Sequence, residues 1–402
     1  MLWSACSSIG VDNADLAARS PRPDLLGYYK SGYYESRADF RSIAQKLRTR
    51  LPGLQCGVLK LVAAEVADLT TDWCYLPPAG TKGDLLVITS GLHGAEGPVG
   101  AAVQRYFMAE ILPGLDRSRS GYLLIHAVNP WGFHHFRRVT GNNVDLNRNF
   151  DASGDNGLYH NKNQGYADLN EFLNPSEPAS QTSYDYFFFT TRSIGKILWH
   201  GIPALRQAIL QGQYQYPQGI YFGGQAPEQE RALLGPLLQG KFAGYKAILA
   251  VDLHTGYGER GVLHLFPNDP VNEAVRSATA AIFAGYRIDW GSSDDFYTIT
   301  GQFTDWMLTL TPRGSLYVPM VFEYGTLDSQ TTAGSIESLK RSMLENQGYF
   351  HGYTSADQKQ AIESDYREAF YPTSPHWRTQ VMQDTIQVWQ TVLPRLRTLG
   401  ER

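Results

Sequence analysis

Short runs of apolar residues recur along the chain, and their length and content of Val, Ile and Leu are typical of buried β-strands. The strongest runs cover residues 84–89, 121–128, 245–252 and 318–322, and weaker strand patterns precede them at 57–63 and 73–76. Apolar positions at helical spacing predict helices over residues 37–51, 98–109, 203–211, 227–239 and 379–397. The succession of strand, helix and strand from residue 84 to 128 predicts a parallel, right-handed β-α-β unit.

These elements predict a single α/β domain built on one mixed, mainly parallel twisted sheet that helices flank. Residues 1–35 look irregular because Pro21 and Pro23 interrupt any early helix. We expect the domain itself over residues 36–402, since no linker-like segment divides that stretch. Residues 151–190 are polar and rich in Asn, Gly and Tyr, so we interpret them as a long loop or insertion.

Composition argues against two classes of partner. The chain has 35 Lys and Arg against 39 Asp and Glu, a net charge of −4 with no long block of like charge, so no nucleic-acid surface is expected. No run approaches the roughly 18 consecutive apolar residues of a membrane-spanning helix. The first residues lack the basic region and apolar core of a signal peptide. We therefore expect neither a nucleic-acid nor a membrane partner.

Three cysteines, Cys6, Cys56 and Cys74, are spread along the chain without a CxxC motif. Their odd number argues against a disulfide framework, and their spacing does not support a thiolate metal site. Because disulfides are rare in the cytoplasm, this cysteine usage favours a cytoplasmic location.

A histidine and a glutamate, His93 and Glu96, lie three residues apart in the segment TSGLHGAEGPVG, directly after the predicted strand 84–89. A second histidine, His254, follows the strand 245–252 in the segment VDLHTG. Because α/β sheets bind ligands beyond the carboxyl ends of their strands, we expect these side chains at one edge of the sheet. Two histidines and a carboxylate form the ligand set of hydrolytic zinc sites, which keep a fourth position open for water.

A further glutamate, Glu323, ends the strand 318–322 in the segment VFEYGT. At a strand end beside a metal site, a glutamate is well placed to act as a general base, although an ordinary strand-end carboxylate would look the same. The stretch from Phe136 to Phe150 holds arginines and asparagines in high density. A guanidinium group matches a carboxylate with two parallel hydrogen bonds, so this stretch suggests an anionic substrate group, while a self-bonded asparagine-rich loop is the alternative.

Four motifs in this order resemble the M14 zinc carboxypeptidase superfamily. They are the His-x-x-Glu pair, NPWGFHHFRRVTGNNVDLNRNF (129–150), VDLHTG (251–256) and VFEYGT (321–326). The segment GQYQYPQGIYFGG (212–224) and the length of the chain are similar to the DUF2817 family, a bacterial branch of uncharacterised function. The resemblance implies a zinc carboxypeptidase-like fold of the phosphorylase/hydrolase-like type and one bound Zn²⁺, and residues 1–35 and 330–402 contribute little to it.

The resemblance also implies roles for single residues. The positions that match the zinc ligands are His93, Glu96 and His254. Glu323 matches the general base that activates water and later protonates the leaving nitrogen. Arg138 matches the arginine that polarises the scissile carbonyl group, and Arg137 is the alternative for that role.

Further matched positions concern the substrate. Asn147 and Arg148 match the pair that grips the terminal carboxylate of the substrate. Tyr297 matches a mobile tyrosine that closes over this carboxylate, and Thr304 matches the base of the pocket for the C-terminal side chain. The resemblance therefore implies a substrate with a free carboxylate beside the bond that is cleaved.

The predicted function is zinc-dependent hydrolysis of an amide bond next to a free carboxylate, in a peptide or an N-acyl amino acid. An alternative within the same superfamily is an N-acyl amino acid deacylase that resembles aspartoacylase and succinylglutamate desuccinylase. A site roofed by residues 151–190 would favour small substrates of this kind. A non-catalytic binding module is the third reading, but it would be expected to have lost a ligand or the base, and the sequence keeps all of them.

Overall fold

A seven-stranded sheet forms the centre of the computed structural model, which describes residues 9–63, 65–267, 272–290 and 299–401. The strands lie in the order β1-β2-β4-β3-β5-β7-β6. Their bounds are β1 Gln55–Leu61, β2 Leu69–Leu76, β3 Asp84–Ser90, β4 Ser120–His126, β5 Ala247–Gly256, β6 Leu263–Phe266 and β7 Leu316–Gly325. The four central strands, β4, β3, β5 and β7, are parallel, whereas β1, β2 and β6 pair antiparallel. The predicted mixed α/β sheet is confirmed, and its parallel part consists of these four strands.

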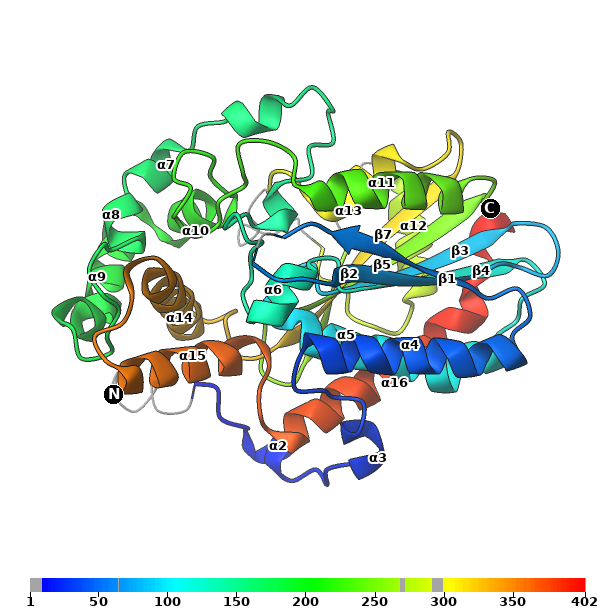
Figure 1. Cartoon of the computed structure of the whole chain (residues 1–402), viewed down its shortest axis with the longest axis horizontal. Coiled ribbons are helices and arrows are strands. Elements are labelled where there is room, and N and C mark those ends of the chain that lie inside the picture. Colours follow the sequence, from blue (N-terminus) through cyan, green and yellow to red (C-terminus); the bar gives the residue numbers. More distant parts are fainter. Residues whose placement is uncertain (1–8, 64, 268–271, 291–298, 402) are drawn as a thin grey trace.

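Helices cover both faces of the sheet, as Figure 1 shows. One face packs against α4 Tyr33–Arg50, α5 Gly97–Tyr106, α12 Glu273–Ile282 and α16 Pro375–Leu396. The other face packs against α11 Gln229–Phe242 and α13 Phe303–Thr309. Along β3, Leu86 and Ile88 face the first layer, while Leu85 and Val87 face the second. Burial on both faces explains why the central strands read as uninterrupted apolar runs.

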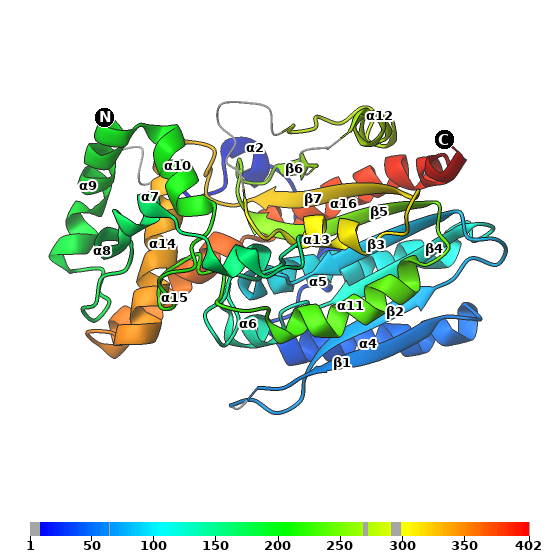
Figure 2. The same cartoon turned by 90° about the horizontal axis from the view of Figure 1, so that it is seen from above.

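A separate lobe of helices lies beside the sheet (Figure 2). It consists of α7 Gln164–Ala167, α8 Asn170–Leu173, α9 Tyr184–His200, α10 Ile202–Leu210, α14 Thr332–His351 and α15 Ala356–Phe370. The lobe has its own core, in which Tyr166, Phe172 and Phe189 pack with Ile336 and Met343. Helices α7, α8 and the first part of α9 lie within the loop or insertion expected at 151–190, and α9 and α10 extend it to residue 210. Helices α14 and α15 were not predicted.

The N-terminal segment predicted as irregular contains two one-turn helices, α2 Ala14–Ala17 and α3 Pro23–Leu26. Leu16 and Leu25 are buried against the layer that contains α16, so this segment belongs to the main core. The remaining short elements are η2 Gly94–Glu96, η3 Phe107–Ile111, η4 Leu112–Gly114, α6 Pro130–His135, η5 Leu146–Arg148, η6 Gly157–His160 and η7 Leu399–Glu401.

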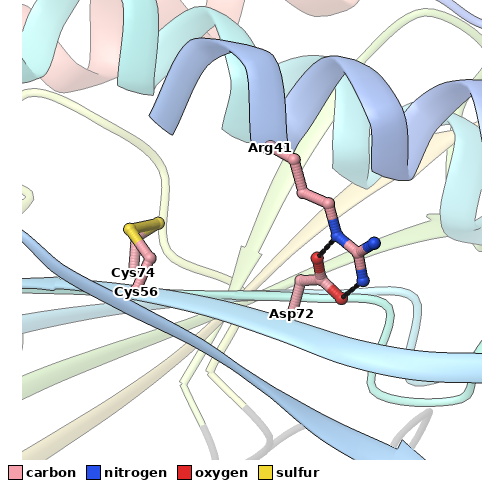
Figure 3. The surroundings of a disulfide bond; sticks show 4 residues. All are labelled: Arg41, Cys56, Asp72 and Cys74. Carbon is pink, nitrogen blue, oxygen red and sulfur yellow. Dashed lines mark hydrogen bonds and ion pairs between the residues drawn. A yellow bond between two sulfur atoms is a disulfide. The ribbon is translucent and has the colours of Figure 1, made fainter. Parts of the chain in front are cut away.

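A disulfide joins Cys56 of β1 to Cys74 of β2 (Figure 3). The two residues are direct partners in the antiparallel register of these strands, which brings their Cα atoms to 4.1 Å. Two residues before Cys74, Asp72 accepts two hydrogen bonds from Arg41 of α4, one of them from Nη2 to Oδ1 at 3.1 Å. The expectation of no disulfide is wrong because the count and spacing of cysteines do not show which of them face each other across a strand pair.

None of the described helices is long and apolar enough to cross a membrane. The disulfide argues against the predicted cytoplasmic location, because such bonds form and persist mainly in oxidising compartments. The predicted cytoplasmic location is thus not confirmed.

Candidate metal centre

Three parallel strands bring the predicted site residues to one edge of the sheet. His93 follows β3, and Glu96 ends the short turn η2. His254 lies near the end of β5 and is the register partner of Glu323 on β7. Both strands run past these residues, to Gly256 and Gly325, so their predicted ends were too early. The predicted convergence at the carboxyl ends of the strands agrees with this geometry.

The position of His93 depends on close packing of the turn η2 against helix α6. A Cβ atom at Gly94 would lie 1.9 Å from the carbonyl carbon of Gly132, closer than any real contact. The backbone of Gly94 also donates to the carbonyl of Arg138 at 3.3 Å. A residue larger than glycine would push the turn away and displace the histidine before it.

The carboxylate of Glu96 lies between two buried imidazole rings. Its Oε1 is 2.8 Å from Nδ1 of His93, and its Oε2 is 2.8 Å from Nδ1 of His254. The backbone N–H of Thr255 donates to Oε2 at 3.1 Å. All three residues are at most 4% exposed, and one ligand-type atom from each lies within 4.8 Å of the others. This cluster can hold one metal ion.

Each imidazole ring has a buried aspartate behind it, at the Nε2 atom that faces away from Glu96. Nε2 of His93 is 3.1 Å from Oδ1 of Asp145, and Nε2 of His254 is 2.7 Å from Oδ2 of Asp252. Thr89 donates a further hydrogen bond to Asp252 at 2.6 Å. A carboxylate behind a ligating histidine fixes the orientation and tautomer of the ring, so both rings are set to offer Nδ1 to a cation. The sequence analysis assigned these aspartates no role, although both lie inside the motifs NNVDLNRNF and VDLHTG.

The charges in this network stabilise one another. Burial opposes the charge of Glu96, but its interactions with His93 and His254 outweigh burial and lower the pKa of Glu96. Burial likewise opposes the charged form of His254, yet Asp252 and Glu96 hold the pKa of that imidazole well above its ordinary value. Burial is also overcome at Asp145, where Arg138 and His93 keep the pKa of the carboxyl well below its usual range. The carboxylates are therefore held in the ionised form that metal ligands require.

The structure separates the two candidate arginines. Arg138 lines the cavity beside Glu96, and its Nε donates to Asp145 at 2.9 Å while Nη1 reaches Glu96 at 3.4 Å. Arg137 instead pairs with Glu345 of α14 at 2.6 Å and lies outside the cavity lining. Arg138 is thus the arginine whose charge faces the candidate metal centre.

Asn147 and Arg148 lie on η5 and line the same cavity. The side-chain oxygen of Asn147 accepts from the N–H of Phe303 at 3.1 Å, which leaves its NH₂ group directed elsewhere. Among the described residues, Arg148 donates to the carbonyl of Leu210 from Nε at 2.9 Å and from Nη2, and to the carbonyl of Asn147 from Nη1 at 3.0 Å. These bonds fix the guanidinium group at the end of α10.

Glu323 lies beside the cluster, partly exposed to the cavity. Its Oε1 accepts a hydrogen bond from the N–H of Tyr257 at 3.0 Å. Burial and the negative charge of Glu96 raise the pKa of Glu323 to about 8. A carboxyl group whose pKa lies near neutral pH can both accept and return a proton.

Two predicted substrate residues remain, Thr304 and Tyr297. Thr304 is 3% exposed on α13, where its carbonyl accepts from Tyr317 at 3.0 Å, and it is not among the residues that line the cavity. Its neighbour Gln302 lines the cavity instead. The place of Thr304 outside the cavity lining does not support the predicted role, which stays a prediction. Tyr297 lies outside the described residues.

A cavity of about 460 Å³ extends from the candidate metal centre into the helical lobe. The sheet side contributes His93, Glu96, His254 and Glu323 to its lining. The lobe contributes residues of α8, α9, α10 and α14. The insertion therefore roofs the site, mainly through its helical part beyond the loop that the sequence predicted. The aromatic stretch that begins at Tyr184 does not line the cavity, since Phe189 is buried and Tyr184 is 73% exposed.

The donor set of the cluster fits zinc. Two imidazole nitrogens and one carboxylate are the protein ligands found in several catalytic zinc sites. Both rings present the same nitrogen to Glu96, and each is supported by its own aspartate. His93, Glu96 and His254 would hold the ion, which agrees with the ligand set that the sequence predicts.

The chain matches one family model and resembles solved structures of low sequence identity. A family model described as "Protein of unknown function (DUF2817)" matches residues 29–384, and no curated protein matches the chain. Bovine thrombin-activatable fibrinolysis inhibitor in complex with tick carboxypeptidase inhibitor is 14% identical, with a TM-score of 0.43, over 89% of this chain and 98% of that chain. A metallo-carboxypeptidase from Burkholderia cenocepacia is 10% identical, with a TM-score of 0.39, over 77% and 66%. The family match includes the sheet, the candidate ligands and the lobe.

We predict that Asp252→Asn weakens zinc binding by about 10- to 100-fold, because the amide is a poorer partner for the ring of His254. Competition with a chromogenic chelator measures this affinity. The matched control is Asp289→Asn, which alters a second His–Asp pair, 2.9 Å from His264 and outside the cavity lining. The control should bind zinc as the wild type does. Unchanged affinity in Asp252→Asn would show that the aspartate does not support the site.

Proposed function

The chain belongs to the DUF2817 family, and from the site described above we propose that it is a zinc-dependent hydrolase that cleaves an amide bond next to a free carboxylate. The observation that carries the proposal is the buried cluster of His93, Glu96 and His254 with Glu323 beside it. The order and spacing of these residues resemble the zinc carboxypeptidases, which supports the same reaction class. Zinc held by the cluster would supply a Lewis acid and lower the pKa of a coordinated water to about 7.

Glu323 is proposed as the group that carries the proton. It reaches the cavity beside His254, its register partner, and the N–H of Tyr257 fixes one of its oxygens. The other oxygen can accept a proton from the attacking water and deliver it to the leaving nitrogen. Its pKa of about 8 keeps both the charged and the neutral forms accessible near neutral pH.

Arg138 is proposed to stabilise the negative charge that develops on the carbonyl oxygen of the scissile bond. Its guanidinium group is anchored by Asp145 and remains in the cavity lining. A fixed positive charge in a site shielded from water stabilises a transition state without reorganisation. Removal of the Arg138 side chain should therefore lower mainly kcat.

Asn147 and Arg148 are proposed to bind the free carboxylate of the substrate. Among the described residues, the hydrogen bonds of Arg148 go to backbone carbonyls and not to a carboxylate, although its charge also acts on Asp145. The NH₂ group of Asn147 adds a neutral donor beside it. A guanidinium group and an amide together suit a carboxylate at this end of the cavity.

A second candidate function is an N-acyl amino acid deacylase that acts on small substrates. The helical roof over the cavity supports it, because helices α8, α9 and α10 restrict the room for a long peptide. Both candidates share the chemistry of the site and differ in what lies on the acyl side of the scissile bond. A non-catalytic binding module is disfavoured, since the ligand set and the proposed base are all present.

We predict that Glu323→Gln retains zinc and loses activity on short peptides and N-acyl amino acids by about 10²- to 10⁴-fold, because an amide cannot accept the proton. His93→Ala is the counterpart and should lose the metal, as measured by elemental analysis of the purified protein. Retained activity in Glu323→Gln would refute its role as the base. Equal zinc content in His93→Ala and the wild type would refute the ligand assignment.

We predict that the enzyme prefers a substrate with a free carboxylate over its amidated form by roughly 10- to 100-fold in kcat/KM, since a charged hydrogen bond is worth about 1.5–3 kcal/mol. Arg148→Ala should abolish this preference and leave hydrolysis of the amidated substrate unchanged. The control Arg192→Ala removes the same charge from an exposed position outside the cavity lining and should retain the preference. Equal cleavage of both forms by the wild type would contradict the carboxylate-binding role and favour an endo-acting enzyme.

A further inference from the structure

The part of the cavity farthest from the sheet has an apolar wall. Helix α10 contributes Ile202, Leu205 and Ile209 to the lining, and α9 contributes Ile197. Ile336 and Leu339 of α14 also line the cavity. The lobe thus adds a hydrophobic surface to a site whose sheet side carries the candidate metal ligands together with Phe266 and Val321.

Helix α10 is unusual because it is largely apolar and yet contains no buried residue. Leu205 and Ile209 pack partly against the core of the lobe, while Ile202 is 36% exposed. The apolar surface that packing leaves uncovered faces the cavity. Such a surface gains free energy when a ligand removes it from water, and a concave apolar surface of this kind marks a binding site.

The wall is longer than one amino-acid side chain. Residues 202 to 209 of α10 span about 10 Å along the helix axis, at roughly 1.5 Å per residue. On α14, Ser335 and Ser342 line the cavity, but their hydroxyl groups already donate to backbone carbonyls at 2.5 and 3.0 Å. Thr332 and Ser338 of α14 and Ser193 of α9 also line the cavity, so the apolar part of the wall lies mainly along α10.

The charges of the cavity favour an anionic ligand. The lobe contributes Lys196 and Arg206 to the lining, in addition to the arginines near the metal centre. Among the described lining residues, the carboxylates are Glu96 and Glu323, and both belong to the catalytic edge. A ligand with a carboxylate and an extended apolar group would match both the charges and the wall.

We infer that the substrate is an N-acyl amino acid whose acyl group is a medium or long aliphatic chain lying along α10. This inference rests on the proposed function and names its substrate class. Hydrolysis would break the amide C–N bond, transfer the oxygen of water to the acyl carbon and a proton to the nitrogen. The products are a fatty acid and a free amino acid.

The test is calorimetric titration of zinc-loaded Glu323→Gln with N-acetylglycine, N-octanoylglycine and N-dodecanoylglycine below their micelle concentrations. Glu323→Gln is used so that binding can be measured without turnover. Affinity should rise by roughly threefold for each added methylene until the wall is covered. An affinity that does not depend on chain length would overturn the inference.

A matched pair of variants locates the binding surface. Leu205→Gln alters the wall, whereas Leu198→Gln makes the same change on α9 at a side chain that is 83% exposed and outside the cavity lining. In the Glu323→Gln background, Leu205→Gln should weaken octanoylglycine by about tenfold and leave acetylglycine unchanged. Ile202→Gln, at the most exposed position of the wall, should act in the same direction if Leu205→Gln fails to fold. Equal losses in Leu198→Gln would mean adsorption to the surface and would overturn the inference.

Activity of the wild type separates this inference from the function on which it rests. Hydrolysis of octanoylglycine at a higher kcat/KM than acetylglycine supports both. Chain-length-dependent binding without hydrolysis of any acylglycine would support the apolar site and show the proposed hydrolase function to be wrong. Hydrolysis of acetylglycine and short peptides without any gain from longer chains would support the hydrolase and overturn the acyl-chain inference.

Discussion

The carboxylate of Glu96, buried between the imidazole rings of His93 and His254, is the interaction on which the rest of the site depends. A buried carboxylate is costly unless every oxygen has a partner, and removal of one partner from a buried charged pair typically costs about 3–5 kcal/mol. The rings in turn require Asp145 and Asp252 behind them. The network therefore links β3, β5 and the η5 loop, and the register of the central strands holds its parts together.

Most of the charged groups that line the cavity lie beside this network, at the sheet edge. The sheet edge concentrates fixed charges, because parallel strands bring their carboxyl ends and the polar residues that follow them to one place. The lobe is assembled from an insertion and from α14 and α15, which have their own core and are free to present apolar surface to the cavity. The candidate metal ligands thus come from the sheet edge, whereas the lobe supplies most of the apolar cavity wall.

The sequence predicts well which residues meet at the sheet edge, namely His93, Glu96, His254 and Glu323. A strand buried on both faces needs an uninterrupted apolar run, and the residues just beyond such runs are easy to find. Contacts between distant segments are not visible in this way. The sequence favours Arg138 over the neighbouring Arg137 only through a motif match, and the pairing of Arg137 with Glu345, 208 positions away, separates the two in the structure. The disulfide and the helices α14 and α15 were missed for a related reason, since their partners are set by the tertiary fold and not by local periodicity. The role of Thr304 was carried over from a motif, and its place outside the cavity lining does not support it.

The central claim is that the two aspartates turn both rings so that Nδ1 meets Glu96 at a single cation site. Anomalous X-ray diffraction from zinc-loaded crystals, recorded on both sides of the zinc absorption edge, tests it most directly. We expect one strong anomalous peak from a zinc ion coordinated by Nδ1 of His93, Nδ1 of His254 and the carboxylate of Glu96. Both Nε2 atoms should still contact their aspartates. A peak coordinated through Nε2, or zinc bound only elsewhere on the molecule, would contradict it.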